Sequence, residues 1–226
     1  MTDLLRMAKR RWHKAAVKRS YGPFSEYITA SEKITGWARG PEAIELARVA
    51  NSLPTDALVV EIGSFLGSSA VLLAGGRKLA GSGLVHCVDP FDGSGDAHST
   101  PVYSDVIDSL ARPIRDQFEQ NVRAAGVYEY VVVHEGTAED VGATWRDPID
   151  MLFLDGDQSP AGAKSAYESW IPFLKPGGVV AVHNSAERLY SPEHDGHRRV
   201  VLESIVPPEY AEIRTIATTT FALRVS

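Results

Sequence analysis

The sequence predicts an α/β fold in which helices cover both faces of a doubly wound, mostly parallel sheet. Short, β-branched apolar runs alternate with longer segments that have helical spacing of apolar residues. The first central run passes directly into a glycine turn, and the chain closes with two apolar runs around three threonines. Alternating strands and helices are typical of a parallel sheet, and a closing hairpin adds one antiparallel strand.

Each element follows from its local pattern. The first expected helix is 41–53, and it begins at Pro41 because proline is favoured at the first helical position. The segment 58–70 begins as a buried strand and turns at Gly63 into a helix. The other expected helices are 68–79, 113–125, 163–174 and 197–205. The other expected strands are 84–89, 130–134, 149–155, the run after the turn at 175–178, and the hairpin pair 213–217 and 221–225.

Size and composition indicate one main globular domain. The chain has 226 residues, 44% of them hydrophobic, which is enough for a sizeable core. Its single cysteine, Cys87, excludes a disulfide framework and favours a reducing cytoplasm. Apolar runs of about 18 residues are absent from the sequence, so no transmembrane segment is expected. We expect a basic N-terminal helix and connection over 1–40 and the main domain over 41–226.

Charge is distributed unevenly. The first 20 residues carry seven Lys and Arg against one Asp, which makes this segment +6 and the remainder −12. It is either a membrane-surface helix, an arm for an acidic partner, or a solvated helix face. The acidic remainder disfavours nucleic acid as substrate. Aromatic residues in 21–40 pack on the body or on a second subunit, which favours a homodimer.

The glycine turn after the first strand predicts a ligand site. Backbone N–H groups converge there at a helix N-terminus, next to Gly63, Ser64 and Ser69. Glu61 ends the same strand, and its carboxylate would repel a pyrophosphate. A cationic, phosphate-free ligand such as S-adenosylmethionine is therefore favoured over a dinucleotide.

Three later segments complete the expected site. Asp89 ends the second strand, where a carboxylate accepts hydrogen bonds from ribose hydroxyls. Small residues after the third strand leave room for an adenine ring, so Thr137 and Ala138 are its expected neighbours. The long polar segment 90–113 is typical of a lid over the substrate. Its candidate substrate contacts are Asp92, Asp96, His98 and Tyr103.

Four motifs carry a family resemblance. In chain order they are EIGSFLGSS, VDPFDGSGD, FLDGDQS and FLKPGGVVAVHN, and a closing hairpin follows them. Over 41–225 the chain resembles the class I S-adenosylmethionine-dependent methyltransferases, which have a Rossmann-like fold. It is most similar to the small O-methyltransferase branch that includes catechol, caffeoyl-coenzyme A and sugar O-methyltransferases. The resemblance implies that Glu61, Gly63 and Ser69 contact the methionine half of the cofactor and that Asp89 contacts its ribose.

The resemblance also implies a divalent cation, Mg²⁺ or Mn²⁺. Asp155, which also borders the cofactor, His183 and Asn184 occupy the positions of its ligands. This sequence departs from the family at two places: His183 stands where an Asp is usual, and Gln158 and Pro160 stand where sugar-directed relatives often have a His and an aromatic residue. Histidine suits Mn²⁺, Zn²⁺ or Fe²⁺ better than Mg²⁺. His183 is therefore either a ligand or the general base of a metal-free reaction.

The expected chemistry is methyl transfer to a hydroxyl group. The protein must align the acceptor with the methyl group and remove the acceptor proton. Asp157 is the first candidate for that proton and His183 the second. The expected acceptor is a sugar, an oligosaccharide or another polyhydroxylated small molecule. The alternatives are a phenol or catechol acceptor, a non-catalytic subunit that binds S-adenosylmethionine, and an NAD-dependent oxidoreductase, which Glu61 disfavours.

Overall fold

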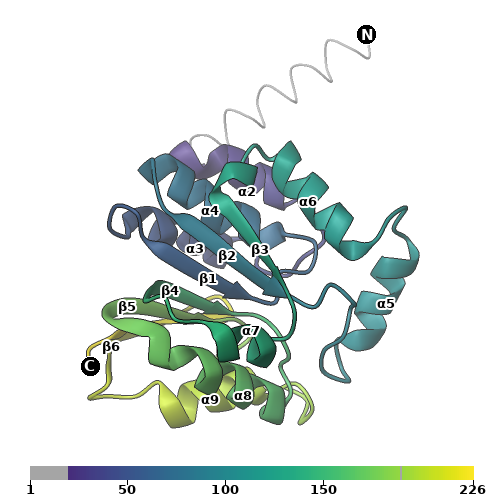
Figure 1. The fold of residues 1–226 in the computed structure, drawn as a ribbon. Helices are drawn as coiled ribbons and strands as arrows, with labels where there is room; N and C mark the ends of the chain where they lie inside the picture. Colours follow the sequence, from purple (N-terminus) through teal and green to yellow (C-terminus); the bar gives the residue numbers. More distant parts are fainter. Residues whose placement is uncertain (1–19, 189) are drawn as a thin grey trace.

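A computed structural model describes residues 20–188 and 190–226, and a seven-stranded sheet forms its centre (Figure 1). The strands are β1 (Leu58–Ile62), β2 (Leu84–Asp89), β3 (Val131–Glu135), β4 (Ile149–Leu154), β5 (Leu174–Val182), β6 (Tyr210–Ile216) and β7 (Thr219–Arg224). Their order is β3-β2-β1-β4-β5-β7-β6. The first five strands are parallel, and β7 runs antiparallel to both of its neighbours. The predicted fold class, including its one antiparallel strand, is confirmed.

Helices cover both faces of the sheet (Figure 1). One face packs against η1 (Gly22–Phe24), α2 (Ser25–Ser31), α3 (Pro41–Ser52), α4 (Ser68–Ala80), α6 (Ile114–Ala124) and η2 (Tyr128–Tyr130). The other packs against α7 (Ala138–Thr144), α8 (Pro160–Trp170), η3 (Ile171–Phe173) and α9 (Gly196–Ser204). Each face buries its own apolar core, the first around Leu72 and Phe118 and the second around Leu152 and Trp170. The central strands are apolar on both sides because both faces are covered.

The chain order creates a crevice between β1 and β4. The chain leaves β1 towards β2 and β3 and leaves β4 towards β5, so the connections diverge at the carboxyl ends of these strands. Ligands of doubly wound sheets bind in this kind of crevice. Gly63 lies at its floor with φ +88°, and a Cβ there would come 2.5 Å from the backbone oxygen of Asp155. Only glycine fits this turn without moving one of the two central strands.

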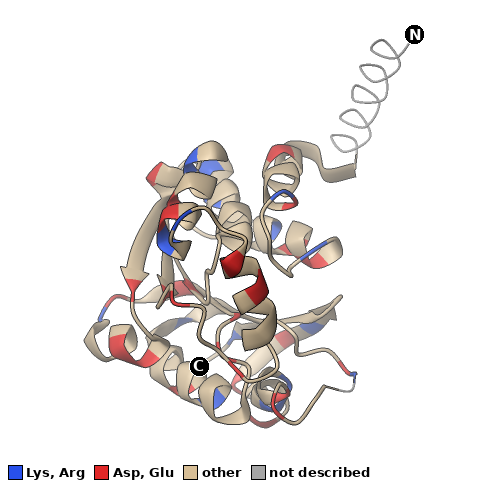
Figure 2. Cartoon of the chain, turned by 90° about the vertical axis from the view of Figure 1, so that its right-hand side faces the viewer, with Lys and Arg blue, Asp and Glu red and all other residues tan. Residues whose placement is uncertain are grey.

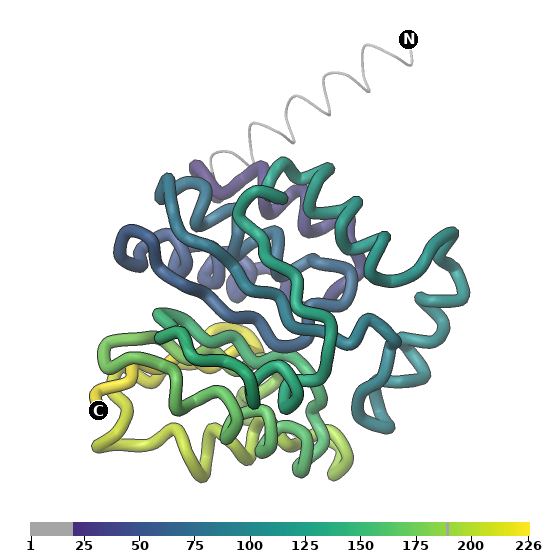
Figure 3. The backbone as a smooth tube through the Cα atoms, viewed as in Figure 1, coloured from purple at the N-terminus to yellow at the C-terminus, as the bar shows by residue number. Residues whose placement is uncertain are grey.

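The segment 90–113 leaves the carboxyl end of β2 and projects past the sheet (Figure 3). It contains a helix, α5 (Thr100–Asp108), that the sequence analysis did not predict. The helix has Pro101 in its first turn and buries none of its residues. Its side chains Tyr103, Val106 and Ile107 are half-buried, and Val106 and Ile107 pack against the first core. So short an apolar stripe in a polar segment gives only a weak helix signal in the sequence.

Two other elements differ from expectation. The loop predicted after β3 continues as α7, whose N-cap Thr137 accepts a hydrogen bond from the backbone N–H of Asp140 at 3.1 Å. The glycine turn predicted at 175–178 lies inside β5, where the register to β4 shifts between Ile149 and Met151. A bulge there absorbs the glycine pair, and the strand continues.

The segment 20–40 packs on the body of this domain. Tyr27, with 3% exposure, covers Gly75 of α4, where a Cβ would come 2.3 Å from its ring. The Arg39 guanidinium donates to the hydroxyl of Ser68 at 2.7 Å, at the start of α4. The basic helix predicted within the first 20 residues falls almost wholly on residues 1–19, which lie outside the described residues. Within the described residues, no helix combines the length and apolarity needed to cross a membrane.

Candidate active site

A pocket of about 420 Å³ opens at the carboxyl ends of β1, β2, β4 and β5. The predicted cofactor residues on its wall are Gly63, Ser64, Ser69, Asp89, Thr137, Ala138 and Asp155. Strands and loops distant in sequence thus bring most of the predicted site together. The pocket is the size of a site for a small organic ligand.

Backbone strain accumulates at the strand ends around this pocket. Phe65, Phe91 and Asn184 follow β1, β2 and β5, and all three have positive φ values of 44°, 52° and 47°. Left-handed backbone costs on the order of 1 kcal/mol or more for a residue with a side chain. The fold tolerates this cost at three of the strand ends that surround the ligand site.

Asp89 is fixed from two sides. Its Oδ2 accepts a hydrogen bond from the Phe65 N–H at 2.8 Å, and its Oδ1 accepts one from the Phe91 N–H at 2.7 Å. These bonds tie the end of β2 to the glycine turn after β1. The carboxylate still reaches the pocket wall, and each of its oxygens has a second lone pair for a ligand hydroxyl.

Glu61 does not line the pocket, so its expected contact with the cofactor is corrected. Its side chain is fully buried, accepts a hydrogen bond from the Ser64 hydroxyl at 2.6 Å, and is not part of the pocket wall. Burial raises its pKa to about 7, against the hydrogen bond from Ser64. Glu61 supports the glycine turn from beneath, so the predicted repulsion of a pyrophosphate by this side chain is not supported.

Of the four predicted substrate contacts, His98 and Tyr103 line the pocket and the other two do not. Asp92 is exposed and accepts a hydrogen bond from the Ser94 N–H at 2.8 Å, so it forms a turn and does not face the ligand. Asp96 is buried with 3% exposure and contacts His194. These two predictions of direct contact are corrected.

An aromatic wall made of Trp37, Phe65 and Tyr103 closes one side of the pocket. The ring centroids lie 5.1 to 5.9 Å apart, so no further ring fits between them. Burial, followed by the charge of Asp155, raises the pKa of Tyr103, so its hydroxyl stays protonated. The wall offers an apolar surface to a ligand, together with one hydroxyl group.

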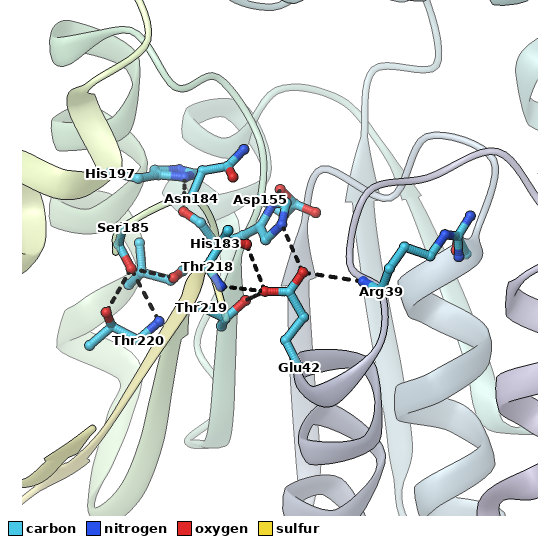
Figure 4. Close-up of polar contacts among 12 residues, drawn as sticks. Arg39, Glu42, Asp155, His183, Asn184, Ser185, His197, Thr218, Thr219 and Thr220 are labelled. Atoms are coloured by element: carbon cyan, nitrogen blue, oxygen red, sulfur yellow. Dashed lines mark hydrogen bonds and ion pairs between the residues drawn. The ribbon is translucent and has the colours of Figure 1, made fainter. Parts of the chain in front are cut away.

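His183 lies between two carboxylates (Figure 4). Its Nδ1 is 2.7 Å from Oδ1 of Asp155 and its Nε2 is 3.6 Å from Oε1 of Glu42. Burial alone would lower the pKa of His183, but Asp155 and Glu42 outweigh it and raise the pKa to about 10. A carboxylate facing each ring nitrogen favours the imidazolium form of His183 at neutral pH.

Glu42 is held by the turn between β6 and β7, which lies beside the end of β5. Its Oε2 accepts hydrogen bonds from the N–H and the hydroxyl of Thr218, at 2.9 and 2.6 Å, and from the hydroxyl of Thr219 at 3.0 Å. Burial would raise the pKa of Glu42, but His183 and Thr218 lower it to about 2. The site thus contains its own cation, paired on both sides with anions.

The residues implied as metal ligands do not fit a divalent cation. Both nitrogens of His183 face carboxylates, with Asp155 on one side and Glu42 on the other, so this side chain offers no free lone pair to a metal ion. A cation ligand must present a free lone pair, and imidazole binds metals in its neutral form. Over residues 20–188 and 190–226, no group of three or more His, Cys, Asp or Glu is arranged to hold a metal ion. The same geometry removes His183 as a general base.

Asp157 lies on the pocket wall, but its surroundings also serve a structural role. The side chain is exposed, and its Oδ1 accepts a hydrogen bond from the Ser159 N–H at 2.8 Å, just before α8. Gln158, one of the two departures from the family, is buried next to it, and its backbone oxygen accepts from the Gly196 N–H at 2.9 Å.

Among the site residues that the sequence did not predict are Trp37, Glu42 and His194. Trp37 belongs to the N-terminal connection, and Glu42 is a polar residue in the first turn of a helix, where acidic residues are common. His194 sits in an irregular loop after β5. None of the three belongs to a recognisable motif, so only the fold reveals that they meet.

Acidic groups dominate the pocket and its cover. Its wall carries Asp89, Glu139, Asp155 and Asp157, and no Lys or Arg occurs among the described residues that line it. Figure 2 faces the side of the molecule where α5 lies, and this helix carries Asp105 and Asp108 but no basic residue. This charge favours a cationic ligand and disfavours one that carries phosphates.

Solved structures share this fold. TomG, an O-methyltransferase from Streptomyces achromogenes solved with SAM, is 20% identical, with coverage of 91% of this chain and 90% of that chain and a TM-score of 0.59. An O-methyltransferase from Bacillus cereus, solved with SAH, is 17% identical, with coverage of 93% and 96% and a TM-score of 0.60. An rRNA methylase from Streptococcus thermophilus is 16% identical, with coverage of 84% and 100% and a TM-score of 0.55. At these identities the comparisons establish the fold, and their acceptors differ.

The sequence itself also matches a known family. Its description is "Methyltransferase domain", and the match extends over residues 60–185, more than half of the chain. This range runs from β1 to the end of β5 and includes the glycine turn, Asp89 and Asp155. The chain therefore belongs to the methyltransferase domain family.

Proposed function

We propose that this protein is an S-adenosylmethionine-dependent O-methyltransferase. The observation that carries the proposal is the convergence of three predicted cofactor contacts in one pocket. The glycine turn at Gly63 would receive the methionine half, Asp89 the ribose, and the start of α7 at Thr137 the adenine.

The charge of the pocket supports this cofactor. S-adenosylmethionine carries an ammonium and a sulfonium group and no phosphate. The wall has four carboxylates and no Lys or Arg among its described residues, and His183 pairs with only one of the four, Asp155. The remaining carboxylates stabilise such a ligand and would repel a pyrophosphate. The charge of the wall, and not Glu61, therefore disfavours an NAD-dependent oxidoreductase.

The proposed acceptor is a hydroxyl of a sugar, an oligosaccharide or another polyhydroxylated small molecule. Polar side chains of the lid and of the strand ends, among them His98, Asp157 and His194, face the same space as the cofactor residues. A phenol or catechol is the second candidate, and the aromatic wall of Trp37, Phe65 and Tyr103 favours it. A flat ring would stack on this wall without entering it.

Removal of the acceptor proton needs a base near the cofactor. Asp157 is the candidate from the sequence, and its Oδ2 would be the accepting atom because Oδ1 is bound to Ser159. We propose that the reaction proceeds without a divalent cation, because the expected ligand set is paired internally.

The proposal is tested first by binding. Isothermal titration with S-adenosylmethionine should show one site, and Asp89→Ala should weaken binding by about tenfold or more through lost charge-assisted hydrogen bonds. Asp92→Ala is the matched control, because this carboxylate belongs to the same segment but lies off the pocket. An unchanged affinity for Asp89→Ala would contradict the placement of the ribose.

Turnover is the second test. Transfer of a labelled methyl group to a panel of sugars and phenols, with EDTA and with added Mn²⁺, separates the two acceptor classes. Tight cofactor binding without transfer to any acceptor would instead favour a non-catalytic binding subunit. Loss of transfer in EDTA, restored by Mn²⁺, would contradict the proposal that no metal is needed.

A homodimer and a cytoplasmic location remain predictions. In the aromatic segment that suggested a dimer, Phe24 and Tyr27 are buried within this chain, whereas Trp37 is 41% exposed. Light scattering of the full chain measures the oligomeric state directly.

A further inference from the structure

A buried carboxylate and a histidine meet where the lid touches the loop after β5. Asp96 belongs to the segment between β2 and α5, and His194 precedes α9. The Nδ1 of His194 is 3.1 Å from Oδ1 of Asp96. Asp96 also accepts hydrogen bonds from the N–H groups of His98 and Ser99, both at 3.0 Å, so its position is fixed.

Hydrogen bonds define which nitrogen of His194 carries the proton. Arg188 has only donors, so its contact at 3.1 Å identifies the oxygen of the Asn184 side chain and leaves the NH₂ group on the other side. That NH₂ group faces Nε2 of His194 at 3.5 Å. Nε2 therefore presents its lone pair, and Nδ1 donates its proton to Asp96.

This arrangement is suited to accept a proton from a ligand. The carboxylate orients the ring and stabilises the imidazolium that forms, as in other carboxylate–histidine pairs. The contact between Nε2 and Asn184 is at the outer limit of hydrogen bonding, so an acceptor hydroxyl can replace it. His194 has 11% of its side chain exposed and lines the same pocket as Asp155 and Gly63.

We propose that His194 is the general base of the methyl transfer and that Asp96 is its positioning residue. The acceptor O–H gives its proton to Nε2 of His194, and the oxygen forms a bond to the methyl carbon of the sulfonium. The carbon–sulfur bond breaks, and its electron pair stays on sulfur as the neutral thioether. The inference rests on the proposed function and replaces Asp157 as the proton acceptor.

The two other candidates are less suited to this step. Both ring nitrogens of His183 face carboxylates, Glu42 and Asp155, so neither is open to an acceptor hydroxyl. Asp157 is exposed and bound at one oxygen to Ser159, and a solvated carboxylate is a weak base for an alcohol. His194 is the pocket imidazole that is both oriented by a buried carboxylate and open at its other nitrogen.

The test compares single variants of the full chain with an acceptor that the wild-type protein methylates. His194→Ala should lower kcat by about 10²- to 10⁴-fold, while titration shows unchanged affinity for S-adenosylmethionine. Added imidazole should restore part of the lost turnover in this variant but not in Asp157→Ala. His194→Gln, which keeps the volume, should show the same loss of kcat if His194→Ala folds poorly by circular dichroism.

Asp96→Asn separates positioning from folding. It should lower kcat without raising KM for the acceptor, because the amide no longer stabilises the imidazolium. His134→Ala is the control for removal of a histidine, since this side chain lies on β3 outside the pocket, and it should retain the wild-type kcat.

The results distinguish this inference from the proposed function. Wild-type turnover in both His194 variants would overturn the inference and leave the proposed function intact. The inference would also be overturned if weaker cofactor binding explained the whole loss of turnover in His194→Ala. A lack of recovery with added imidazole would overturn it as well. If the wild-type protein binds no S-adenosylmethionine, both proposals fail.

Discussion

Glu42→Gln is expected to destabilise the protein strongly. Glu42 is 3% exposed, and its carboxylate accepts four hydrogen bonds, from Arg39, Thr219 and both donors of Thr218. It also neutralises the His183 imidazolium. A glutamine has one oxygen and one NH₂ group, so its NH₂ must face either the imidazolium or these donors.

The magnitude follows from burial. Removing one partner of a buried ion pair costs about 3–5 kcal/mol where the other charge is left uncompensated. Because Asp155 still faces His183 at 2.7 Å, we expect the lower end of this range, about 3 kcal/mol. For a domain of this size, each kcal/mol lowers the melting temperature by about 2–4 °C, so Glu42→Gln should melt on the order of 10 °C lower. His183 then retains only Asp155 as an anionic partner.

Urea unfolding at pH 6 measures the effect. The pKa of His183 is raised, so its stabilisation is complete below its ordinary value of 6.5 and is lost as the pH rises towards about 10. The pKa of Glu42 is lowered, so its stabilisation is complete above its ordinary value of 4.5 and is lost towards about pH 2. Both contributions are therefore fully present at pH 6.

Glu45→Gln is the matched control on the same helix. Glu45 pairs with Arg214 at 2.7 Å near the surface, where the Arg214 side chain is 43% exposed, and such a pair contributes about 0–1 kcal/mol. If Glu42→Gln lowers the free energy of unfolding no more than Glu45→Gln does, the contacts of Glu42 with His183 and Thr218 do not stabilise the fold. That result would refute the prediction.

Three further predictions concern the turn, acid stability and metal removal. Gly63→Ala should abolish cofactor binding in titrations or prevent folding, because its Cβ would meet the Asp155 backbone. Gly177→Ala, with φ +82° and open space around it, should lower the free energy of unfolding by only about 1 kcal/mol. Equal effects of the two variants would contradict the close approach at Gly63. Burial lowers the pKa of His197 to about 3, so the unfolded chain takes up its proton first as the pH falls. The free energy of unfolding should then drop by about 2 kcal/mol between pH 6.5 and 5. In His197→Asn, measured by urea unfolding at both pH values, this part of the decrease should be absent. Treatment with EDTA should leave turnover unchanged. His183→Asp removes the internal cation, so this variant should gain Mn²⁺ binding, measured by electron paramagnetic resonance. A wild-type protein that binds Mn²⁺ equally well would contradict the role of His183 as an internal cation.

Local patterns in the sequence determined the elements of the central sheet. The runs at β1, β2 and β4 are apolar on both sides because both faces of the sheet are covered, and such runs are recognisable without tertiary information. The glycine turn and Asp89 follow these strands directly, so the strand order brings them together. Most of the expected cofactor residues could therefore be assigned from the sequence.

The tertiary structure decided which charged side chains face the ligand. Glu61 and Asp89 both sit at strand ends in the sequence, yet one is buried beneath the turn and the other reaches the pocket. Glu61 pairs with Cys87, two residues before Asp89, so Glu61 lies deeper in the sheet, whereas Asp89 is the last residue of β2. This register between strands cannot be read from either strand alone.

Only the fold could reveal the pairs formed between distant segments. Glu42 of α3 meets His183 and Thr218 at the ends of two neighbouring strands, and Asp96 meets His194 between two loops. Each pair joins residues separated by about a hundred positions or more, and neither partner is unusual in its local sequence. The charge state of His183 and the orientation of His194 depend on these contacts, so the choice between metal ligand, fixed cation and base required the tertiary structure.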